Sequence, residues 1–313
     1  MEVWVAGATG VLGRHTVPQL IAAGHSVVGL ARDLSKWPNP PPQMRFIPCD
    51  ITASGQVIQA FAQGKPDAIL HLATAIPTER PTAKDWQRND AVRRGGTENL
   101  SEAALVADAY YIQQSVHYVM APQGDDWINE DAPFQHSVVV DSAIDAERLT
   151  NKAFQRGLRG CILRPSTLYG ADSPQTKAIV HAVKSGMPIL VGSGKNFWSF
   201  IHPDDVASAI VRALEVQPPA ETYNLSDDEP VRMADCLKWL AETLHAHPPK
   251  GIAPFLAKLA LGGDMVDLLI ASRRISNSRA KERLGWRPAY PTFRDGFTAE
   301  LPRMQQPGAV GRE

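Results

Sequence analysis

The segment Gly7-Ala8-Thr9-Gly10-Val11-Leu12-Gly13 joins a short apolar run, Val3–Ala6, to a helical pattern near residues 11–22. Gly7 lets the chain turn sharply off a strand, Gly10 leaves no Cβ in the way of a pyrophosphate, and Gly13 allows close packing of the new helix. The helix N-terminus presents free N–H groups and a positive dipole end to an anion. We therefore expect Gly7, Thr9, Gly10, Val11, Leu12 and Gly13 to bind the phosphates of a dinucleotide. The alternative is a tight turn with no ligand.

Outward from this loop, short apolar runs alternate with helix-length segments through the first half of the chain. The runs that we interpret as strands are Val3–Ala6, Ser26–Ala31, Arg45–Pro48, Ala68–His71, Tyr110–Gln113 and Cys161–Arg164. Strands separated by helices indicate βαβ units and a parallel sheet. The expected fold class is α/β, a Rossmann-like doubly wound parallel sheet with a smaller C-terminal substrate lobe.

The regular alternation of apolar runs and helical segments ends near residue 165, where proline and glycine become frequent and the helical segments shorten. We expect a dinucleotide-binding domain over residues 1–165, joined by a returning strand near 222–225. Residues 166–306 are expected to form mostly a substrate-binding lobe. Residues 307–313 are expected to be a flexible tail.

The composition of the chain argues against several classes of protein. The 313 residues contain 32 Lys and Arg and 33 Asp and Glu, so the basic excess typical of nucleic-acid binding is missing and no such partner is expected. Cys49, Cys161 and Cys236 are far apart, which argues against disulfides and a metal site and favours a reducing compartment. No apolar run reaches membrane-spanning length. We expect a cytoplasmic protein whose partner is a small-molecule substrate, with a homodimer left open.

The end of the second strand bears on the choice of cofactor. An NAD-selective fold places an acid there to hold the ribose 2′-hydroxyl, whereas this chain has Ala31 followed by Arg32. A small residue leaves room for a 2′-phosphate, and the arginine next to it can donate two charge-assisted hydrogen bonds to that phosphate. Arg14 could donate a further one. We favour NADP over NAD as the cofactor. The alternative is that Arg32 is a surface residue and Asp33 holds the ribose.

Several motifs, in the same order along the chain, resemble those of one family. They are the GATGVLG start, His71-Leu72-Ala73, Gly96-Thr97-Glu98-Asn99-Leu100, Arg164-Pro165-Ser166-Thr167-Leu168-Tyr169-Gly170, His202-Pro203-Asp204-Asp205-Val206-Ala207 and Leu284-Gly285-Trp286-Arg287-Pro288. Together they resemble the extended short-chain dehydrogenase/reductase family, which includes NAD(P)-dependent epimerases and dehydratases. The resemblance implies further cofactor contacts: Asp50 and Ile51 beside adenine, Leu72, Ala73 and Thr74 along the pyrophosphate and ribose, and Pro165 and Leu168 beside nicotinamide. Core packing is the alternative role of the apolar ones.

One part of the family pattern is missing. Family members use a tyrosine as acid/base and a lysine four residues later, which lowers the tyrosine pKa and holds the nicotinamide ribose. Four residues after the six tyrosines of this chain stand, in order, Gln114, Ser115, Pro122, Ser173, Asp227 and Arg294. Alignment on Glu147, which matches a family glutamate, places Val139 and Ala143 at the tyrosine and lysine positions. The resemblance is therefore to an atypical branch that lacks the Tyr-x-x-x-Lys pair.

Substitute catalytic groups are expected on the loop after the fifth strand, where Ser115, His117 and Tyr118 lie. The alternatives are a structural histidine at His117, packing at Tyr118, and a register that puts Val116 in place of Ser115. The first hypothesis for function is an NADP(H)-binding oxidoreductase acting on a small organic substrate. The second is a non-catalytic NADP(H)-binding sensor or scaffold. A nucleotide-sugar epimerase or dehydratase is a weaker third, because the missing pair counts against it.

Overall fold

The centre of the fold is a parallel sheet whose strands are buried on both faces. The computed structural model describes residues 1–77 and 82–305. Its seven-stranded sheet has the order β12-β7-β5-β4-β1-β2-β3, and every pairing is parallel. The strands are β1 (Glu2–Ala6), β2 (Ser26–Ala31), β3 (Met44–Pro48), β4 (Ala68–His71), β5 (Tyr110–Gln114), β7 (Gly160–Pro165) and β12 (Glu221–Leu225). The predicted doubly wound α/β fold is confirmed.

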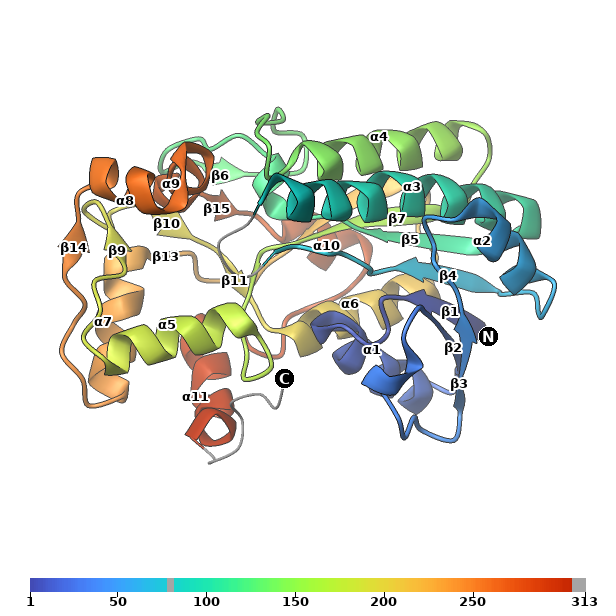
Figure 1. Cartoon of the computed structure of the whole chain (residues 1–313), viewed down its shortest axis with the longest axis horizontal. Helices are drawn as coiled ribbons and strands as arrows, with labels where there is room; N and C mark the ends of the chain where they lie inside the picture. The colour runs from blue at the N-terminus through green and yellow to red at the C-terminus, as the bar shows by residue number, and fades with distance from the viewer. Residues whose placement is uncertain (78–81, 306–313) are drawn as a thin grey trace.

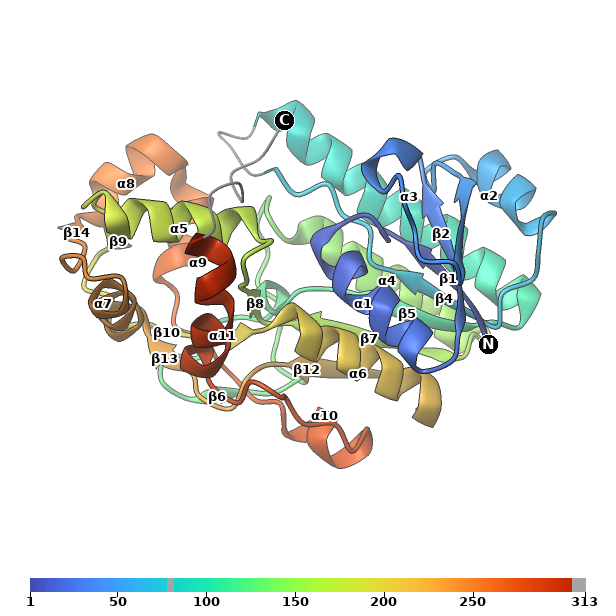
Figure 2. The same ribbon diagram turned by 90° about the horizontal axis from the view of Figure 1, so that it is seen from below.

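Helices cover both faces of this sheet (Figure 1). On one face α3 (Ala83–Ala107) and α4 (Asp141–Gln155) lie side by side, with α2 (Ser54–Phe61) beyond them; on the other lie α1 (Val11–Ala22) and α6 (Pro203–Val216), which Figure 2 shows in front of the sheet. Successive residues of β1 enter opposite layers: Val3 and Val5 pack with α1 and α6, whereas Trp4 and Ala6 pack under α2 and α3. Both layers are apolar, which explains why the strands show no alternation in sequence.

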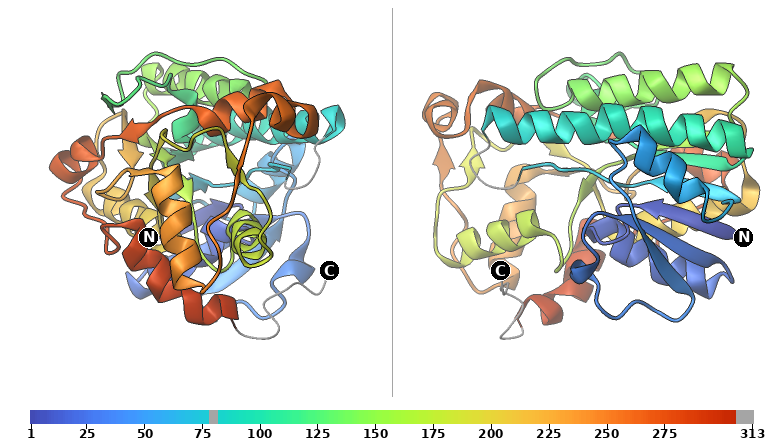
Figure 3. Two further views of the ribbon diagram at one scale, coloured as in Figure 1. Left: turned by 90° about the vertical axis from the view of Figure 1, so that its left-hand side faces the viewer. Right: turned by 45° about the vertical axis from the view of Figure 1, so that its right-hand side comes forward.

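The remaining elements form a small lobe with a second, aromatic core, which the left view of Figure 3 faces. Tyr169, Phe200, Phe293 and Phe297 meet there, with the rings of Tyr169 and Phe297 stacked at 4.8 Å. The lobe's helices are α5 (Pro174–Lys184), α7 (Met233–Thr243), α8 (Pro254–Leu261), α9 (Gly263–Ile270) and α11 (Phe293–Gln305). Its two-residue strands are β8 (Thr167–Leu168), β9 (Leu190–Val191), β10 (Phe197–Trp198), β11 (Phe200–Ile201), β13 (Val231–Arg232) and β14 (Gly251–Ile252).

Some of the chain after residue 165 belongs to the main sheet. β12 pairs with β7, and Ala280, Leu284 and Trp286, at and after α10 (Ser278–Arg283), share the core beneath α6. The Trp286 indole N–H donates to Ser208 Oγ of α6 at 2.9 Å. The expected domain bounds and the substrate-binding role of most of residues 166–306 stay predictions. The tail expected over 307–313 lies outside the described residues.

None of the helices within residues 1–77 and 82–305 combines the length and the apolar character needed to cross a bilayer.

Candidate active site

The glycine loop after β1 meets the segment after β4, at the point where the strand order reverses. Gly7 has φ +91, and a Cβ on it would lie 2.6 Å from Ala73 N, so only glycine allows this approach. A Cβ on Gly13 would lie 2.3 Å from Gly7 O, so Gly13 lets the helix start close against its own loop. A Cβ on exposed Gly10 would meet only Gly7 O, at 3.3 Å. The loop therefore closes on itself and leaves the side of Gly10 open.

The start of α1 is suited to an anion. Helix geometry leaves the first N–H groups without acceptors inside the helix. In the described part of the chain no side chain caps this end at Gly10, and the first turn holds no acid that would repel a phosphate. The residues present thus fit a pyrophosphate beside Gly10, on the positive end of the helix dipole.

Polar groups gather beyond the ends of β2 and β3, where the adenosine half of a dinucleotide would lie. Arg32 is exposed, and Asp33 Oδ1 accepts hydrogen bonds from Ser35 N and Oγ, so this carboxylate caps the short 3-10 helix η1 (Leu34–Lys36). Burial would raise the pKa of Asp50, but hydrogen bonds from Thr52 and the charge of Arg32 outweigh it and lower that pKa. Asp50 is therefore ionised, close to the Arg32 guanidinium.

The segment after β4 is held by α3. Asn89 Oδ1 accepts a 3.0 Å hydrogen bond from Ala75 N, and Asn99 Nδ2 donates to Ile51 O at 2.8 Å. The first contact holds the segment after β4, which contains the expected residues Leu72, Ala73 and Thr74, with Leu72 buried and Thr74 exposed. The second holds the segment after β3, which contains the expected residue Ile51.

Ser115 belongs to a buried polar network. Its hydroxyl donates a 2.5 Å hydrogen bond to Glu147 Oε1 on α4. Glu147 also forms a bidentate ion pair with Arg164 of β7, at 2.8 and 2.7 Å, and Arg164 donates to Glu130 O. All of the side chains in this network are enclosed. The network ties β5, α4 and β7 together, so the Ser115 hydroxyl is engaged in packing these elements.

His117 and Tyr118 lie in the short 3-10 helix η2 (His117–Val119), with ring centroids 3.8 Å apart. Burial and the nearby Arg273 charge lower the pKa of His117 to about 3, so the ring is neutral near pH 7. Its Nδ1 lies 3.2 Å from Pro165 O, and the Nδ1–H group of a neutral ring can donate a hydrogen bond to that oxygen. The Tyr118 hydroxyl contacts Thr167 Oγ1 at 3.0 Å, and burial raises the pKa of Tyr118. Both groups therefore face the segment that contains Pro165 and Leu168.

The wall beside η2 is apolar. Val116, Val139 and Leu268 are partly buried against a cluster that includes Ala143 and Ile144 of α4. Val139 and Ala143 are the two residues that alignment on Glu147 places at the tyrosine and lysine positions. Neither side chain can donate or accept a proton, so this wall can exclude water but cannot supply acid–base chemistry.

Two buried arginines near this wall were not predicted from the sequence. Arg273 donates to Met120 O and Gln135 Oε1, and its guanidinium carbon lies 5.5 Å from the Tyr118 ring centroid. Arg93 of α3 reaches Val139 O. Neither arginine belongs to a motif, and only the fold brings them near the carboxyl edge of the sheet, where the expected cofactor crevice would lie. Asn89, one turn before Arg93, also carries no local signal.

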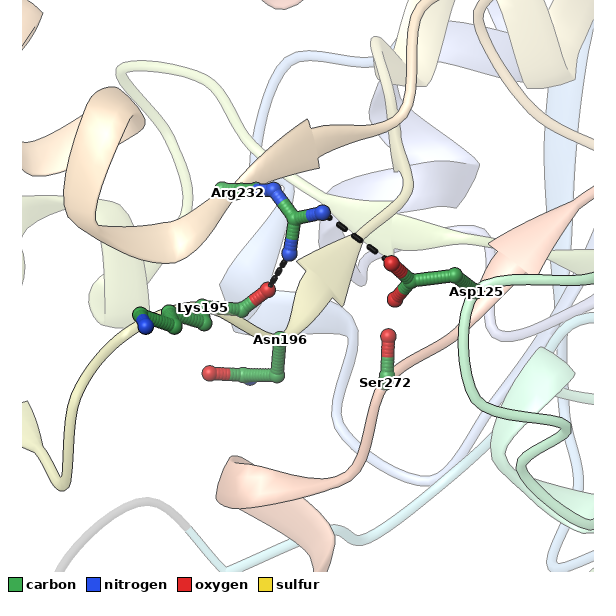
Figure 4. A pocket seen from close by; sticks show the side chains of 5 residues that line it. All are labelled: Asp125, Lys195, Asn196, Arg232 and Ser272. Carbon is green, nitrogen blue, oxygen red and sulfur yellow. Dashed lines mark hydrogen bonds and ion pairs between the residues drawn. The ribbon is translucent and has the colours of Figure 1, made fainter.

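A second candidate for a ligand site is a pocket of about 670 Å³ in the small lobe, lined by Asp125, Lys195, Asn196, Arg232 and Ser272 (Figure 4). Arg232 points toward Asp125 and pairs with it at 3.0 Å, and it also donates to the Lys195 carbonyl. Its guanidinium lies 4.3 Å from the Phe197 ring centroid. The arginine is thus already neutralised and stacked, and the pocket lacks the glycine loop and helix end of the crevice.

Known proteins resemble this chain over almost its whole length. The model of the NAD dependent epimerase/dehydratase family matches residues 3–226. A 3-diazoavenalumate denitrifying reductase from a Streptomyces species is 33% identical, over 96% of this chain and 100% of that protein. A UDP-glucose 4-epimerase of Mycolicibacterium smegmatis is 26% identical, over 92% of this chain and 94% of that one. The crystal structure of the human epimerase family protein SDR39U1 with NADPH has a TM-score of 0.78 at 18% identity, over 96% and 99% of the two chains. The chain therefore belongs to the NAD dependent epimerase/dehydratase family.

Proposed function

We propose that this protein is an NADP(H)-dependent reductase that delivers hydride to a small organic substrate which needs no proton from a tyrosine–lysine pair. The observation that carries this proposal is the apolar wall of Val116, Val139 and Ala143 beside the expected nicotinamide position. Such a wall keeps water from a hydride donor. It suits an acceptor that becomes stable as soon as hydride is added, and it does not suit a ketone, whose alkoxide must be protonated.

An arenediazonium ion is such an acceptor, and we propose this substrate class. When bound, NADPH supplies the hydride, and its addition to a diazonium carbon with departure of dinitrogen (R–N₂⁺ + H⁻ → R–H + N₂) balances without a proton. The relative that is 33% identical carries the name of a denitrifying reductase of a diazo compound, which supports this class. The neutral state of His117 and the raised pKa of Tyr118 also support it, because neither group is a strong acid near pH 7.

The residues at the other end of the crevice support NADP rather than NAD, with NAD the alternative. Arg32 is exposed beyond β2, and Asp33 is engaged by Ser35, so the charge offered to a ribose substituent is positive. The open side of Gly10 and the N–H groups of α1 would hold the pyrophosphate. Asp50, Ile51, Leu72, Ala73, Thr74, Pro165 and Leu168 would border the rest of the cofactor.

Isotope labelling tests the proposal. The protein is incubated in D₂O with an arenediazonium ion and NADPH, and in H₂O with NADPH carrying deuterium at C4. We expect dinitrogen release, deuterium from the labelled cofactor at the carbon that lost nitrogen, and none from solvent. Gly10→Val, which fills the phosphate cradle, should reduce the rate to that of the reaction without protein, and Gly55→Ala should not. Fast reduction of simple aldehydes and ketones with no reaction of diazo compounds would overturn the assignment. Tight NADPH binding without turnover of any acceptor would favour the sensor hypothesis.

A further inference from the structure

Arg93 is a buried cation, and within residues 1–77 and 82–305 no carboxylate forms an ion pair with it. Its side chain is 5% exposed, and burial lowers its pKa to about 10, although the Asp90 charge acts in the opposite direction. Among the described residues its one hydrogen bond is from Nη1 to Val139 O, at 3.5 Å, and no acid lies within ion-pair distance. A guanidinium has five N–H donors, so most of its hydrogen-bonding capacity is unused. An uncompensated buried charge is costly, which indicates a purpose other than stability.

The surroundings of Arg93 place it at a definite point of the crevice. Asn89, one turn earlier on the same face of α3, holds Ala75 N through Oδ1, while its buried Nδ2 has no partner in residues 1–77 and 82–305. The Arg93 charge adds to burial in lowering the pKa of His71, at the end of β4, to about 4. On its other side Arg93 reaches the carbonyl of Val139, just before α4. Arg93 therefore lies between the segment after β4 and the start of α4.

This point corresponds to the nicotinamide half of the cofactor. The sheet order β3-β2-β1-β4-β5-β7 sets the direction of a dinucleotide across its edge. Arg32 and Asp50 mark the adenosine end over β2 and β3, and the glycine loop marks the pyrophosphate at β1 and β4. The nicotinamide ribose then lies next along the edge, near the end of β4 and the start of α4. Arg93 is the cation at that place.

We propose that Arg93, with Asn89 Nδ2 beside it, binds the hydroxyl groups of the nicotinamide ribose. The inference rests on the proposed NADP(H) binding. Ala143, at the position of the family lysine, offers no donor, and Arg93 supplies donors from α3 instead. The planar guanidinium can give two parallel N–H groups to the ribose diol, and the Asn89 amide can give a third. The lysine position is thus replaced by a residue from a different helix.

A comparison of two ligands separates this role from a structural one. Adenosine 2′,5′-bisphosphate contains the adenosine half of NADPH but no nicotinamide ribose. We expect Arg93→Gln to weaken NADPH binding about tenfold, which corresponds to about 1.4 kcal/mol, and to leave binding of the bisphosphate unchanged in calorimetry. Arg93→Lys, which keeps the charge and protects against misfolding, should show a smaller loss for NADPH alone. Arg94→Gln is the matched control, because neighbouring Arg94 is half exposed and pairs with Asp90 and Asp145.

The outcomes distinguish the two proposals. Equal losses for both ligands, or no loss for either Arg93 variant, would overturn the role of Arg93 while leaving NADP(H) binding intact. If Arg93→Gln does not fold, the Arg93→Lys result decides between the same alternatives. If the unmodified protein binds the bisphosphate and NADPH equally well, the nicotinamide ribose makes no contact and Arg93 does not hold it. If the unmodified protein binds neither ligand, the proposed function itself is wrong.

Discussion

The Ser115 hydroxyl donates a 2.5 Å hydrogen bond to Glu147, whose carboxylate is held on its other side by Arg164. The hydroxyl that the sequence nominates for catalysis is therefore part of a buried network that joins β5, α4 and β7. A buried hydrogen bond to a charged group stabilises a fold more than a neutral one does. His117 and Tyr118 are then the predicted catalytic residues left nearest the expected nicotinamide position, and neither is a strong acid near pH 7.

Removal of this hydroxyl should affect stability more than cofactor binding. We expect Ser115→Ala to lower the free energy of unfolding by about 1–3 kcal/mol, measured by urea denaturation, with NADPH affinity unchanged. Ser115→Thr, which keeps the hydroxyl, should recover part of the loss. A stable Ser115→Ala variant with selectively slowed hydride transfer would show that Ser115 acts on the substrate.

The His117 ring should make the protein sensitive to acid. Its pKa is about 3 in the folded protein against 6.5 for a free histidine, so the unfolded chain binds a proton first as the pH falls. Stability is therefore complete above about pH 6.5 and is lost progressively as the pH falls toward 3. We expect His117→Gln to have a shallower loss of unfolding free energy between pH 6.5 and 4. His247→Gln, a change at an exposed histidine, should follow the unmodified protein. Identical slopes for all three proteins would contradict a buried neutral His117.

Asp227, just after β12, should have the opposite dependence on pH. Burial, together with the charges of Asp228 and Glu229, raises its pKa well above the usual 3.8. The unfolded chain releases this proton near pH 4 while the folded protein retains it, so stability falls as the pH rises above about 4. Asp227→Asn removes this loss without a large change of shape. We expect a higher melting temperature for the variant at pH 7 and a smaller difference at pH 4. A lower melting temperature at pH 7 would mean that the ionised carboxylate is needed.

Cofactor selectivity should depend on Arg32. A charge-assisted contact with the 2′-phosphate contributes about 1.5–3 kcal/mol, so Arg32→Ala should weaken NADPH about tenfold to a hundredfold and leave NADH nearly unchanged. Arg45→Ala, at an exposed arginine on β3 that pairs with Glu2, is the control and should alter neither. Calorimetry with both cofactors decides the question. Equal losses, or tighter binding of NADH by the unmodified protein, would refute the preference for NADP.

The close approach at Gly13 predicts a steric effect. A Cβ there would lie 2.3 Å from Gly7 O and 2.4 Å from Ala8 O, so Gly13→Ala must displace the loop. We expect this overpacking to cost about 1–3 kcal/mol and to weaken NADPH binding. Gly55→Ala, in α2 with no atom within 4 Å of the new Cβ, should instead stabilise the protein by about 0.5–1 kcal/mol. If Gly13→Ala were neutral in both measurements, the loop would not be closed as described.

The sheet and the glycine loop could be predicted from the amino-acid sequence, because both depend on local patterns. Apolar runs such as Ala68–His71 specify buried strands wherever they occur, and the spacing of Gly7, Gly10 and Gly13 is a property of one turn. The sequence alone also shows that none of its tyrosines has a lysine four residues later. None of these features depends on contacts between segments that are distant in the sequence.

The surroundings of the expected nicotinamide position depend on contacts that no local pattern specifies. Ser115 and Glu147 are far apart in sequence, as are Arg93 and Val139, and no spacing rule connects them. Burial lowers the pKa of His117, and no carboxylate of the described residues pairs with buried Arg93. Both environments arise where η2 and the helices α3 and α4 pack against distant segments. Side-chain environment depends on contacts between distant segments, whereas helix and strand formation depends mainly on neighbouring residues. The candidate chemistry of these side chains therefore depends on the tertiary fold and does not follow from local sequence patterns.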